Sequence, residues 1–323
     1  MNTCWSRPAL YCAGFAGLLL IGQSRSTAQI QKAAGQNIVP VYEGWERNAD
    51  GSFNMVFGYM NRNYEEQLDI PIGSDNSISP GPADQGQPTH FYRRRQQFVF
   101  KVRVPKDWGQ KDLVWTLTSR GSTDKAYGSL LPIWELGNLV YQENRGGLGV
   151  MTWPEEPNEP PSVEMVGSSQ LSVTLPETLT LTVDVSDDGH PKPRVRRAGA
   201  ANVVRDSDGA VATGQGRGGG SASAEPVKES PLSQAVVKLD PGVRLGVTWV
   251  LYRGPAPVEF EPTHVAVAKL PAAGVEAKVE HLEGKATTKV TFTQTGTYRL
   301  RCYADDSVLI TPLDVSVTVQ AAH

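Results

Sequence analysis

The sequence is poor in cysteine and in long apolar runs, and both shortages exclude classes of protein. Only 3 cysteines occur in 323 residues. Downstream of the amino-terminal segment only Cys302 remains, so neither an intramolecular disulfide nor the paired thiols of a zinc site can form. The longest apolar run, Ala9 to Gly22, is shorter than the roughly 20 residues that a membrane-spanning helix needs. Stability must therefore come from packed cores.

Motifs of common catalytic sites are also missing. The glycine-rich stretch GQGRGGGSAS has no lysine where a phosphate-binding loop needs one, and no strand and helix flank it. Ser129 lacks the flanking glycines of a nucleophile elbow. The 5 histidines are scattered and fall in no recognisable motif. Basic and acidic residues nearly balance, at 31 and 34, which makes nucleic acid an unexpected partner.

The first 28 residues have the pattern of a secretory signal peptide. A short polar start carries Arg7, the apolar run follows, and Ser26, Thr27 and Ala28 supply small residues for cleavage after Ala28. A lipid anchor on Cys12 is disfavoured because that cysteine lies inside the apolar run. We therefore expect an exported protein, periplasmic or extracellular, without a transmembrane segment in the mature chain.

Strand patterns dominate the rest of the chain. Apolar and polar residues alternate at 98–104, 113–117, 171–175, 179–185 and 313–319, as in half-buried strands. The pattern predicts an all-β protein with two β-sandwich domains of the immunoglobulin-like type in tandem. The turn-rich stretch 73–90 is expected to be a loop over the end of the first sandwich.

Composition predicts the boundaries of these units. A tail at 29–37 precedes the first sandwich at 38–153, and a linker rich in proline and glutamate follows at 154–162. The second sandwich covers 163–320, and a flexible insertion interrupts it at about 190–240.

Three stretches of the second half carry a family resemblance. PPSVEMVGSSQLSVTLPETLTLTVDVSDDG, GVTWVLYRGPAPVEF and KVTFTQTGTYRLRCYADDSVLITPLDVSVTV resemble, in that order, the strands of a PKD-like immunoglobulin-type domain over Pro161 to Val319. The resemblance implies a structural role for Trp249 on the third strand, and the long insertion departs from it. The amino-terminal half resembles a module of uncharacterised exported bacterial proteins, which implies export and no activity.

The stretch GTYRLRCYADD, residues 296–306, is predicted to have a structural role and not to form an active site. Gly296 permits a tight approach into the strand, and Tyr298 lies where such sandwiches tie a corner through the phenolic hydroxyl. Cys302 lies four residues after Tyr298 on the same strand, so its side chain is on the same inward face. It is therefore expected to be a buried thiol with a raised pKa, and not a nucleophile.

Aspartates gather in two loops of the second domain, namely Asp187 with Asp188, and Asp305 with Asp306. Clustered carboxylates are what a structural Ca²⁺ ion requires. Aspartates are also common in turns for reasons of local hydrogen bonding, and no stretch has the spacing of a calcium loop. We expect no cofactor, and structural calcium stays open.

Two groups of residues are candidates for binding. The first is the basic cluster of Arg93, Arg94 and Arg95, which would suit an anionic surface or would guard a strand edge. The second is Trp108 and Trp134, which lie near turns and would form aromatic platforms or fill a core.

The sequence therefore favours a non-catalytic exported module that binds an envelope or extracellular protein or glycan. The alternative is an accessory or catalytic component of extracellular carbohydrate or peptide hydrolysis.

Overall fold

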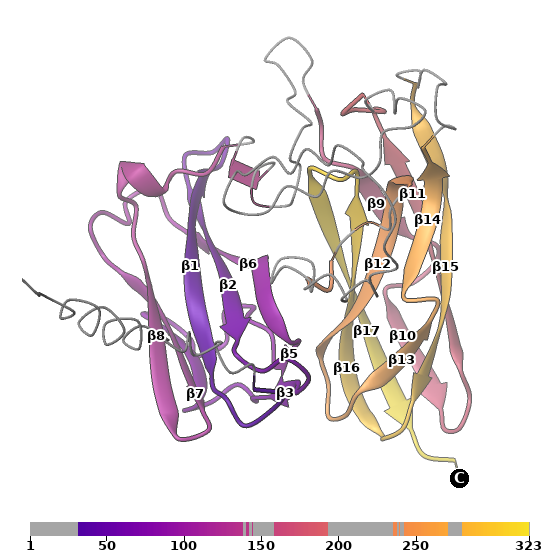
Figure 1. The fold of residues 1–323 in the computed structure, drawn as a ribbon, viewed down its shortest axis with the longest axis horizontal. Coiled ribbons are helices and arrows are strands. Elements are labelled where there is room, and N and C mark those ends of the chain that lie inside the picture. The colour runs from indigo at the N-terminus through magenta and orange to yellow at the C-terminus, as the bar shows by residue number, and fades with distance from the viewer. Residues whose placement is uncertain are drawn as a thin grey trace, which may run out of the picture.

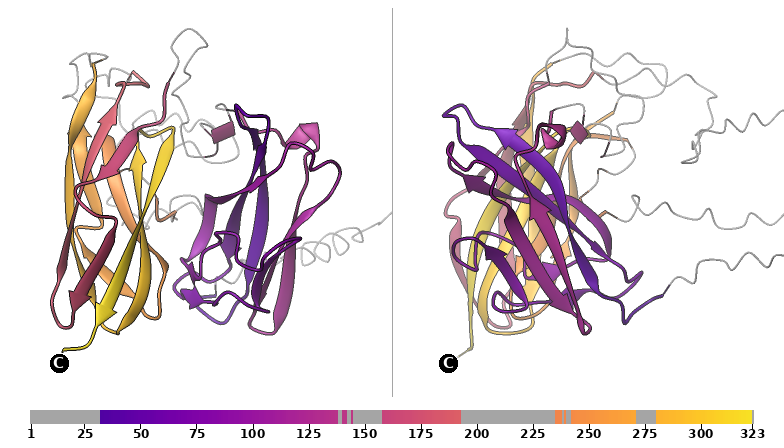
Figure 2. Two further views of the ribbon diagram at one scale, coloured as in Figure 1. Left: turned by 180° about the vertical axis from the view of Figure 1, so that it is seen from behind. Right: turned by 90° about the vertical axis from the view of Figure 1, so that its left-hand side faces the viewer.

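The computed structural model describes residues 32–137, 140–141, 144, 158–192, 235–237, 239, 242–270 and 280–322. These ranges form two β-sandwich domains that lie side by side (Figures 1 and 2). The regular structure is β-strand apart from a 3-10 helix, η1 (Pro132–Trp134), and helical residues at 140, 141 and 144. The all-β prediction is confirmed. The predicted signal peptide and most of the insertion lie outside the described residues.

The amino-terminal domain packs two three-stranded sheets against each other. One has the order β1 (Ile38–Arg47), β2 (Phe53–Asn61), β6 (Arg94–Val104); the other has the order β4 (Asn76–Ser79), β7 (Leu113–Ser119), β8 (Ser122–Gly128). The short strands β3 (Leu68–Asp69) and β5 (His90–Phe91) pair separately. Aromatic rings join the two larger sheets, since Trp115 on β7 contacts Phe57 and Phe100 with centroids 6.1 and 4.9 Å away.

The carboxy-terminal domain is an immunoglobulin-like sandwich by its strand order. A four-stranded sheet has the order β13 (Val258–Glu261), β15 (Leu282–Phe292), β11 (Leu179–Asp187), β9 (Ser162–Met165). A five-stranded sheet has the order β10 (Gln170–Thr174), β17 (Ile310–Gln320), β16 (Gly296–Asp305), β12 (Val243–Arg253), β14 (His264–Lys269). The first strand of the domain thus switches sheets between β9 and β10, and β10 runs parallel to β17.

A second switch between sheets leaves part of β12 without a neighbour on one side. β13 pairs with β15 in one sheet, whereas β14 pairs with the first half of β12, from Val243 to Thr248, in the other. The second half of β12, Trp249 to Arg253, is paired with β16 on its opposite edge. The five-stranded sheet lies on the side of the domain that faces the amino-terminal domain (Figure 1). This half-open edge of β12 is the place where the domains meet.

The turn-rich stretch 73–90 is not only a loop, which corrects one expectation. Residues 76–79 form β4 and pair with β7. Asn76 is fully buried and its side-chain amide donates to the carbonyl oxygens of Ile70 and Pro88, while Ile78 is 1% exposed in the core. A buried amide and one buried isoleucine outweigh the turn-forming composition. Within the described ranges, no helix has both the length and the apolar composition needed to cross a membrane.

Candidate functional site

The joint between the domains is built around Tyr252, which belongs to β12 but packs in the core of the amino-terminal domain. Tyr252 is 2% exposed and shares that core with the aromatic side chains described above. Its hydroxyl donates a hydrogen bond to the carbonyl oxygen of Gly86, and its own carbonyl accepts one from the amide of Thr89 at 3.2 Å. The stretch before β5 therefore wraps the end of β12.

Tyr92 closes the open edge of β12 from the amino-terminal domain. The backbone amide of Leu251 donates to the Tyr92 hydroxyl at 2.8 Å, in the position where a neighbouring strand would supply a carbonyl. The adjacent amide of Trp249 donates to the carbonyl of Thr263 at 3.0 Å. Burial raises the pKa of Tyr92, so its hydroxyl stays neutral and keeps a proton to donate while its oxygen accepts this bond. A side chain of one domain thus satisfies the backbone of the other.

Two arginines of the carboxy-terminal domain reach across the joint. Arg301 forms an ion pair with Asp314 at 2.6 Å, lies 3.7 Å from the Tyr252 ring centroid and donates to the carbonyl of Val99 at 2.9 Å. Arg253 donates to both carboxylate oxygens of Asp84 at 2.8 Å. The hydrogen bond from Arg253 lowers the pKa of Asp84 to about 2. Bidentate and stacked geometries of this kind fix orientation as well as distance.

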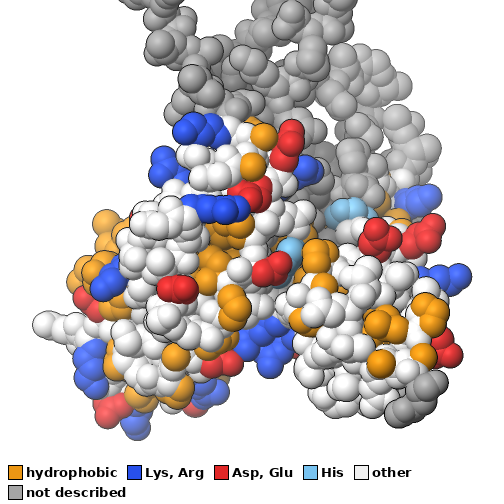
Figure 3. All heavy atoms as spheres, turned by 90° about the horizontal axis from the view of Figure 1, so that it is seen from below, with side chains coloured by type: hydrophobic (Ala, Val, Ile, Leu, Met, Phe, Trp, Pro, Cys, Tyr) orange, Lys and Arg blue, Asp and Glu red, His pale blue; other side chains and the backbone are white. Residues whose placement is uncertain are grey.

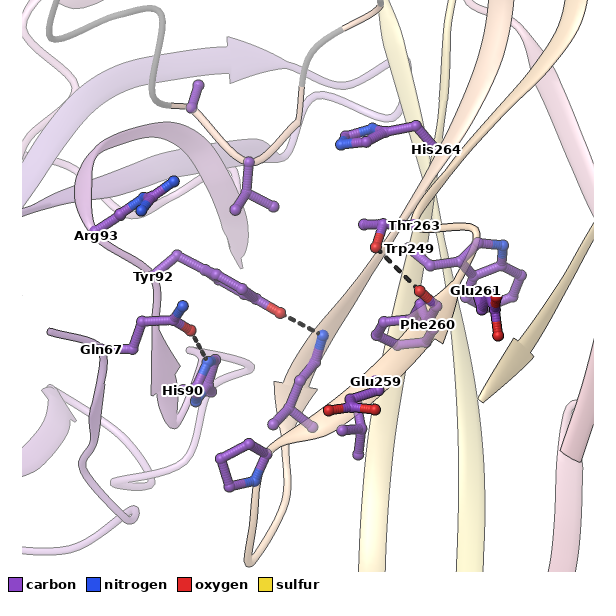
Figure 4. Close-up of a pocket in the computed structure, with 15 residues that line it drawn as sticks. Gln67, His90, Tyr92, Arg93, Trp249, Glu259, Phe260, Glu261, Thr263 and His264 are labelled. Carbon is purple, nitrogen blue, oxygen red and sulfur yellow. Dashed lines mark hydrogen bonds between the residues drawn. The ribbon is translucent and has the colours of Figure 1, made fainter. Parts of the chain in front are cut away.

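A pocket of about 790 Å³ opens beside this joint, with walls from both domains. Seen from below, histidine and basic side chains lie along the line where the two domains meet (Figure 3). The pocket is lined by Gln67, His90, Tyr92, Arg93, Ala235, Val236, Trp249, Leu251, Pro257, Val258, Glu259, Phe260, Glu261, Thr263 and His264. Arg93 and Tyr92 reach into it from the amino-terminal domain, and Phe260, Glu259 and His264 lie opposite (Figure 4).

The histidines of the pocket are held by neighbouring polar groups. His90 is 5% exposed, and its Nδ1 and Nε2 lie 2.7 and 2.8 Å from oxygen atoms of Asp69 and Gln67. His264 Nδ1 lies 3.0 Å from Thr248 Oγ1. Among the described residues, the hydrogen-bond partners of the two imidazoles are therefore a carboxylate, an amide and a threonine hydroxyl.

The three arginines predicted as a basic cluster point to different places. Arg93 is exposed and lines the pocket. Arg94 is 7% exposed, stacks 3.8 Å from the Tyr64 ring centroid and donates to the carbonyl of Arg62. Arg95 pairs with Glu43 at 2.7 Å. The three charges do not form one anion-binding surface.

The two candidate tryptophans also differ. Trp108 is 9% exposed and its Nε1–H donates to the carbonyl of Lys111 at 2.8 Å, so its ring faces are not available for stacking with a ligand. Of the two roles left open for Trp108, a platform for a ligand or part of a core, its burial supports the second, because the turn after β6 folds the indole back onto the core. Trp134 on η1 is 45% exposed, next to Ile133, and lies away from the pocket between the domains.

The candidate aspartates act as turn caps. Asp188 accepts hydrogen bonds from the amides of Glu159 and His190, and Asp305 accepts one from Ser307. Within the described residues, no three side chains of the metal-binding types His, Cys, Asp and Glu come together as ligands. Local hydrogen bonding therefore accounts for these aspartates as the structure describes them.

Asp187 and Asp306 are buried carboxyls, and the charge of Asp187 acts on Asp306. Burial is the main cause that raises the pKa of Asp187 to about 6 and that of Asp306 to about 7, and the charge of Asp187 raises the latter further. Asp306 accepts hydrogen bonds from the amides of Val308 and Leu309, both at 2.6 Å, and from Asn158 Nδ2 at 3.0 Å. The two carboxyls lie at the linker end of the second domain, outside the pocket.

Of the four residues assigned a structural role, Trp249, Tyr298 and Cys302 lie in the second core, and Gly296 begins β16 beside it. Cys302 is fully buried, and burial raises the pKa of its thiol to about 12. The Tyr298 hydroxyl donates to the carbonyl of Gln294 at 2.8 Å and so ties the corner before β16. Gly296 has a φ of 142°, and a Cβ atom there would lie 2.8 Å from Pro255 Cγ. Trp249 is 1% exposed and stacks on Phe260.

Sequence reasoning missed Tyr92, Tyr252, Glu259 and Phe260, which build the joint and the pocket. One signal was present. The run GVTWVLYRG in β12 is apolar on both strand faces instead of alternating, and a strand of this kind is covered on both sides. The four-stranded sheet covers one face of β12, and the amino-terminal domain covers the other.

Comparisons with known proteins do not assign the chain to a family. No protein-family description and no curated protein matches the chain. Among solved structures, fibronectin(III)-like modules of Clostridium thermocellum CbhA match 88% of this chain and 95% of theirs, with 11% identity and a TM-score of 0.19. Domains 4 and 5 of the S-layer protein SbsC match 88% of this chain and 98% of theirs, with 9% identity and a TM-score of 0.22. Because these TM-scores are low, the immunoglobulin-like assignment depends on the strand order alone.

Proposed function

We propose that this chain is an exported, non-catalytic interaction module that binds an envelope or extracellular protein or glycan in the pocket between its two sandwiches. The observation that carries the proposal is the shared pocket: side chains of both domains wall it, and the buried joint beside it fixes them. Preformed pockets of 300 to 1,000 Å³ with a few convergent polar groups are typical of ligand sites. We further assign the second domain to the PKD-like kind, from the three sequence stretches quoted above.

The joint supports binding because it holds the pocket in one shape. Tyr252, Arg253 and Arg301 connect the domains through hydrogen bonds, an ion pair with Asp84 and a ring contact. A ligand that enters such a site does not have to order two independent domains, which lowers the entropic cost of association.

The carboxylates support binding over hydrolysis. A glycosidase places two carboxylates on opposite sides of a scissile bond, about 5 to 9.5 Å apart. In the pocket, Glu259 and Glu261 lie on one strand, and both are exposed. The carboxyls with raised pKa values, Asp187 and Asp306, do not line the pocket.

A screen of the mature chain, starting at Gln29, against polysaccharides and peptides tests this function. We expect saturable binding without products. Thr263→Trp, which fills the pocket from an exposed position, should abolish binding, whereas Thr295→Trp, at an exposed turn elsewhere, should not. Turnover of any polymer would favour the hydrolytic alternative, and binding that survives Thr263→Trp would place the ligand elsewhere.

Export has its own test. Amino-terminal sequencing of the protein from the producing cell's envelope and medium should give Gln29 as the first residue. Full-length protein found only inside the cell would contradict export and would leave the pocket to be judged by the binding assay.

A further inference from the structure

We propose that the pocket binds a short peptide that carries both a carboxylate and an ammonium group, with the carboxylate at Arg93 and the ammonium at Glu259. The inference rests on the proposed function and names its ligand class. It follows from the placement of opposite charges on the two walls of one pocket (Figure 4).

Arg93 is a basic side chain on the amino-terminal wall of the pocket, and it has no internal partner among the described residues. Its guanidinium forms no ion pair or hydrogen bond with another residue of the described ranges, and its side chain points into the pocket. The next two arginines in the chain have partners within the protein: Arg94 stacks on the Tyr64 ring, and Arg95 forms an ion pair with Glu43. A guanidinium is planar and binds a carboxylate through two parallel hydrogen bonds. Arg93 is therefore suited to the carboxylate of a ligand.

Glu259 is the matching anion on the opposite wall. It is exposed, and its carboxylate forms no ion pair within the described part of the chain. Its cross-strand partner is Thr291, which is neutral, whereas the partner of Glu261 is Lys289. Lys289 offsets the charge of Glu261, and nothing offsets that of Glu259 across the strand. An ammonium group in the pocket would therefore be attracted to Glu259 in particular.

The surface between these charges suits a peptide backbone with small side chains. The rings of Tyr92 and Phe260 supply apolar faces, and Gln67 and Thr263 supply polar groups at the margins. The Tyr92 hydroxyl already accepts a bond from Leu251, so the edge of β12 is closed to strand addition. Affinity should accordingly come from the two charged ends. A neutral oligosaccharide would leave both charges without a partner.

Unblocked alanine peptides of two to five residues are the direct probe, because each carries one ammonium and one carboxylate. We expect at least one length to bind saturably to the mature chain, as measured by calorimetry and by tryptophan fluorescence, since Trp249 lines the pocket. The same peptide with both ends blocked should bind about 10-fold more weakly or worse, because a hydrogen bond to a charged group typically contributes enough for a factor of this size.

Two variants and two matched controls locate the charges. Arg93→Gln and Glu259→Gln should each weaken binding of the unblocked peptide about 10-fold or more. Each should also remove the part of the difference between unblocked and blocked peptides that belongs to its own end of the peptide, and the part that belongs to the other end should remain. Lys106→Gln and Glu177→Gln remove one cation and one anion from exposed positions outside the pocket and should change neither value.

The outcomes separate this inference from the proposed function. Equal binding of blocked and unblocked peptides, or binding of a neutral oligosaccharide that Thr263→Trp abolishes, would overturn the ligand class and keep the pocket as a binding site. Unblocked peptide binding that neither Arg93→Gln nor Glu259→Gln weakens would also overturn it. Cleavage of the peptides would contradict the non-catalytic function instead.

Discussion

Asp306 is a buried carboxyl whose oxygens accept three hydrogen bonds, from two backbone amides and Asn158. Its pKa is nevertheless raised to about 7, because burial and the nearby charge of Asp187 outweigh these bonds. Asn158 Oδ1 is buried without a hydrogen-bond partner, so rotation of that amide would let Oδ1 accept a hydrogen bond from the protonated carboxyl of Asp306. The neutral carboxyl is therefore the form that this environment accommodates.

The stability of the protein should consequently fall as pH rises from 5 to 8. A carboxyl whose pKa is higher in the folded than in the unfolded state stabilises the fold fully at pH values below its unfolded pKa of 3.8. This stabilisation is lost as pH rises through the folded pKa of about 7. We expect a decrease in unfolding free energy on the order of 2 to 4 kcal/mol from this group. Urea titrations of the wild type and Asp306→Asn would measure it, and the variant should have the flatter profile. A wild type that gains stability between pH 5 and 8 would contradict the assignment.

Cys302 should be inert in the folded protein. Its thiol is fully buried, and a pKa of about 12 leaves very little thiolate at pH 8. Alkylation of the mature chain should be at least about 1,000-fold slower in buffer than in denaturant, because burial raises the thiol pKa from an ordinary value of 9.0 to about 12. Rapid labelling of the native protein would place the sulfur at the surface.

Single residues show where sequence patterns are informative and where they fail. The two-residue period of β16 places Tyr298, Leu300 and Cys302 on one face, and all three are fully buried. Trp108 lies in a turn, where no period applies, and its burial depends on the path of the chain after β6. Arg93, Arg94 and Arg95 are consecutive, yet β6 begins at Arg94, and their side chains go to different places: Arg94 stacks on Tyr64, Arg95 pairs with Glu43 and Arg93 lines the pocket. Strand phase can predict burial, but partners across the fold cannot be derived from it.

At the scale of elements, β12 connects the two domains through its half-open edge. The switch between β13 and β14 leaves Trp249 to Arg253 paired on one side by β16, and Tyr92 supplies the missing acceptor for the Leu251 amide. An edge left open in this way would be a site for unwanted strand pairing. The amino-terminal domain covers it.

Tyr92→Phe should destabilise the protein by about 1 to 3 kcal/mol, because it leaves the Leu251 amide buried without an acceptor. The matched control is Tyr127→Phe, since Tyr127 is 57% exposed, and it should change the unfolding free energy by less than about 0.5 kcal/mol. Chemical denaturation of both variants measures the difference. Equal stability of Tyr92→Phe and the wild type would mean that water replaces the hydroxyl.

The alternation of apolar and polar residues predicts most of the long strands in both domains, but it does not predict how the chain passes from one sheet to the other. β6, β7, β11 and β17 have the predicted inward faces. β4 escaped prediction because Asn, Ser and Gly dominate its surroundings, and only its pairing with β7 and the burial of Asn76 make it a strand. The β13–β14 switch, which opens the pocket, depends on contacts with β15 and β12 that are distant in sequence.

At the scale of the whole molecule, the two sandwiches share part of one core. The Tyr252 ring lies among the buried aromatic residues of the amino-terminal domain while its backbone belongs to a central strand of the carboxy-terminal domain. Arg301 stacks on that ring and donates to the carbonyl of Val99. Interfaces between domains in one chain are usually more polar and permit motion, unless they are large and apolar. The shared core predicts that the two domains unfold together.

Differential scanning calorimetry should therefore give one cooperative transition for the wild type. Tyr252→Ala removes a ring from the shared core, and truncation of a buried aromatic side chain typically destabilises by about 3 to 5 kcal/mol. The amino-terminal domain loses part of its core, whereas the core of the second sandwich, around Trp249 and Leu300, stays intact. We expect the transition to split into two, with the first at lower temperature. Tyr127→Ala, at an exposed position of β8, should keep a single transition. Two transitions in the wild type would show that the domains fold independently, and the pocket between them would then lack the fixed walls on which ligand binding depends.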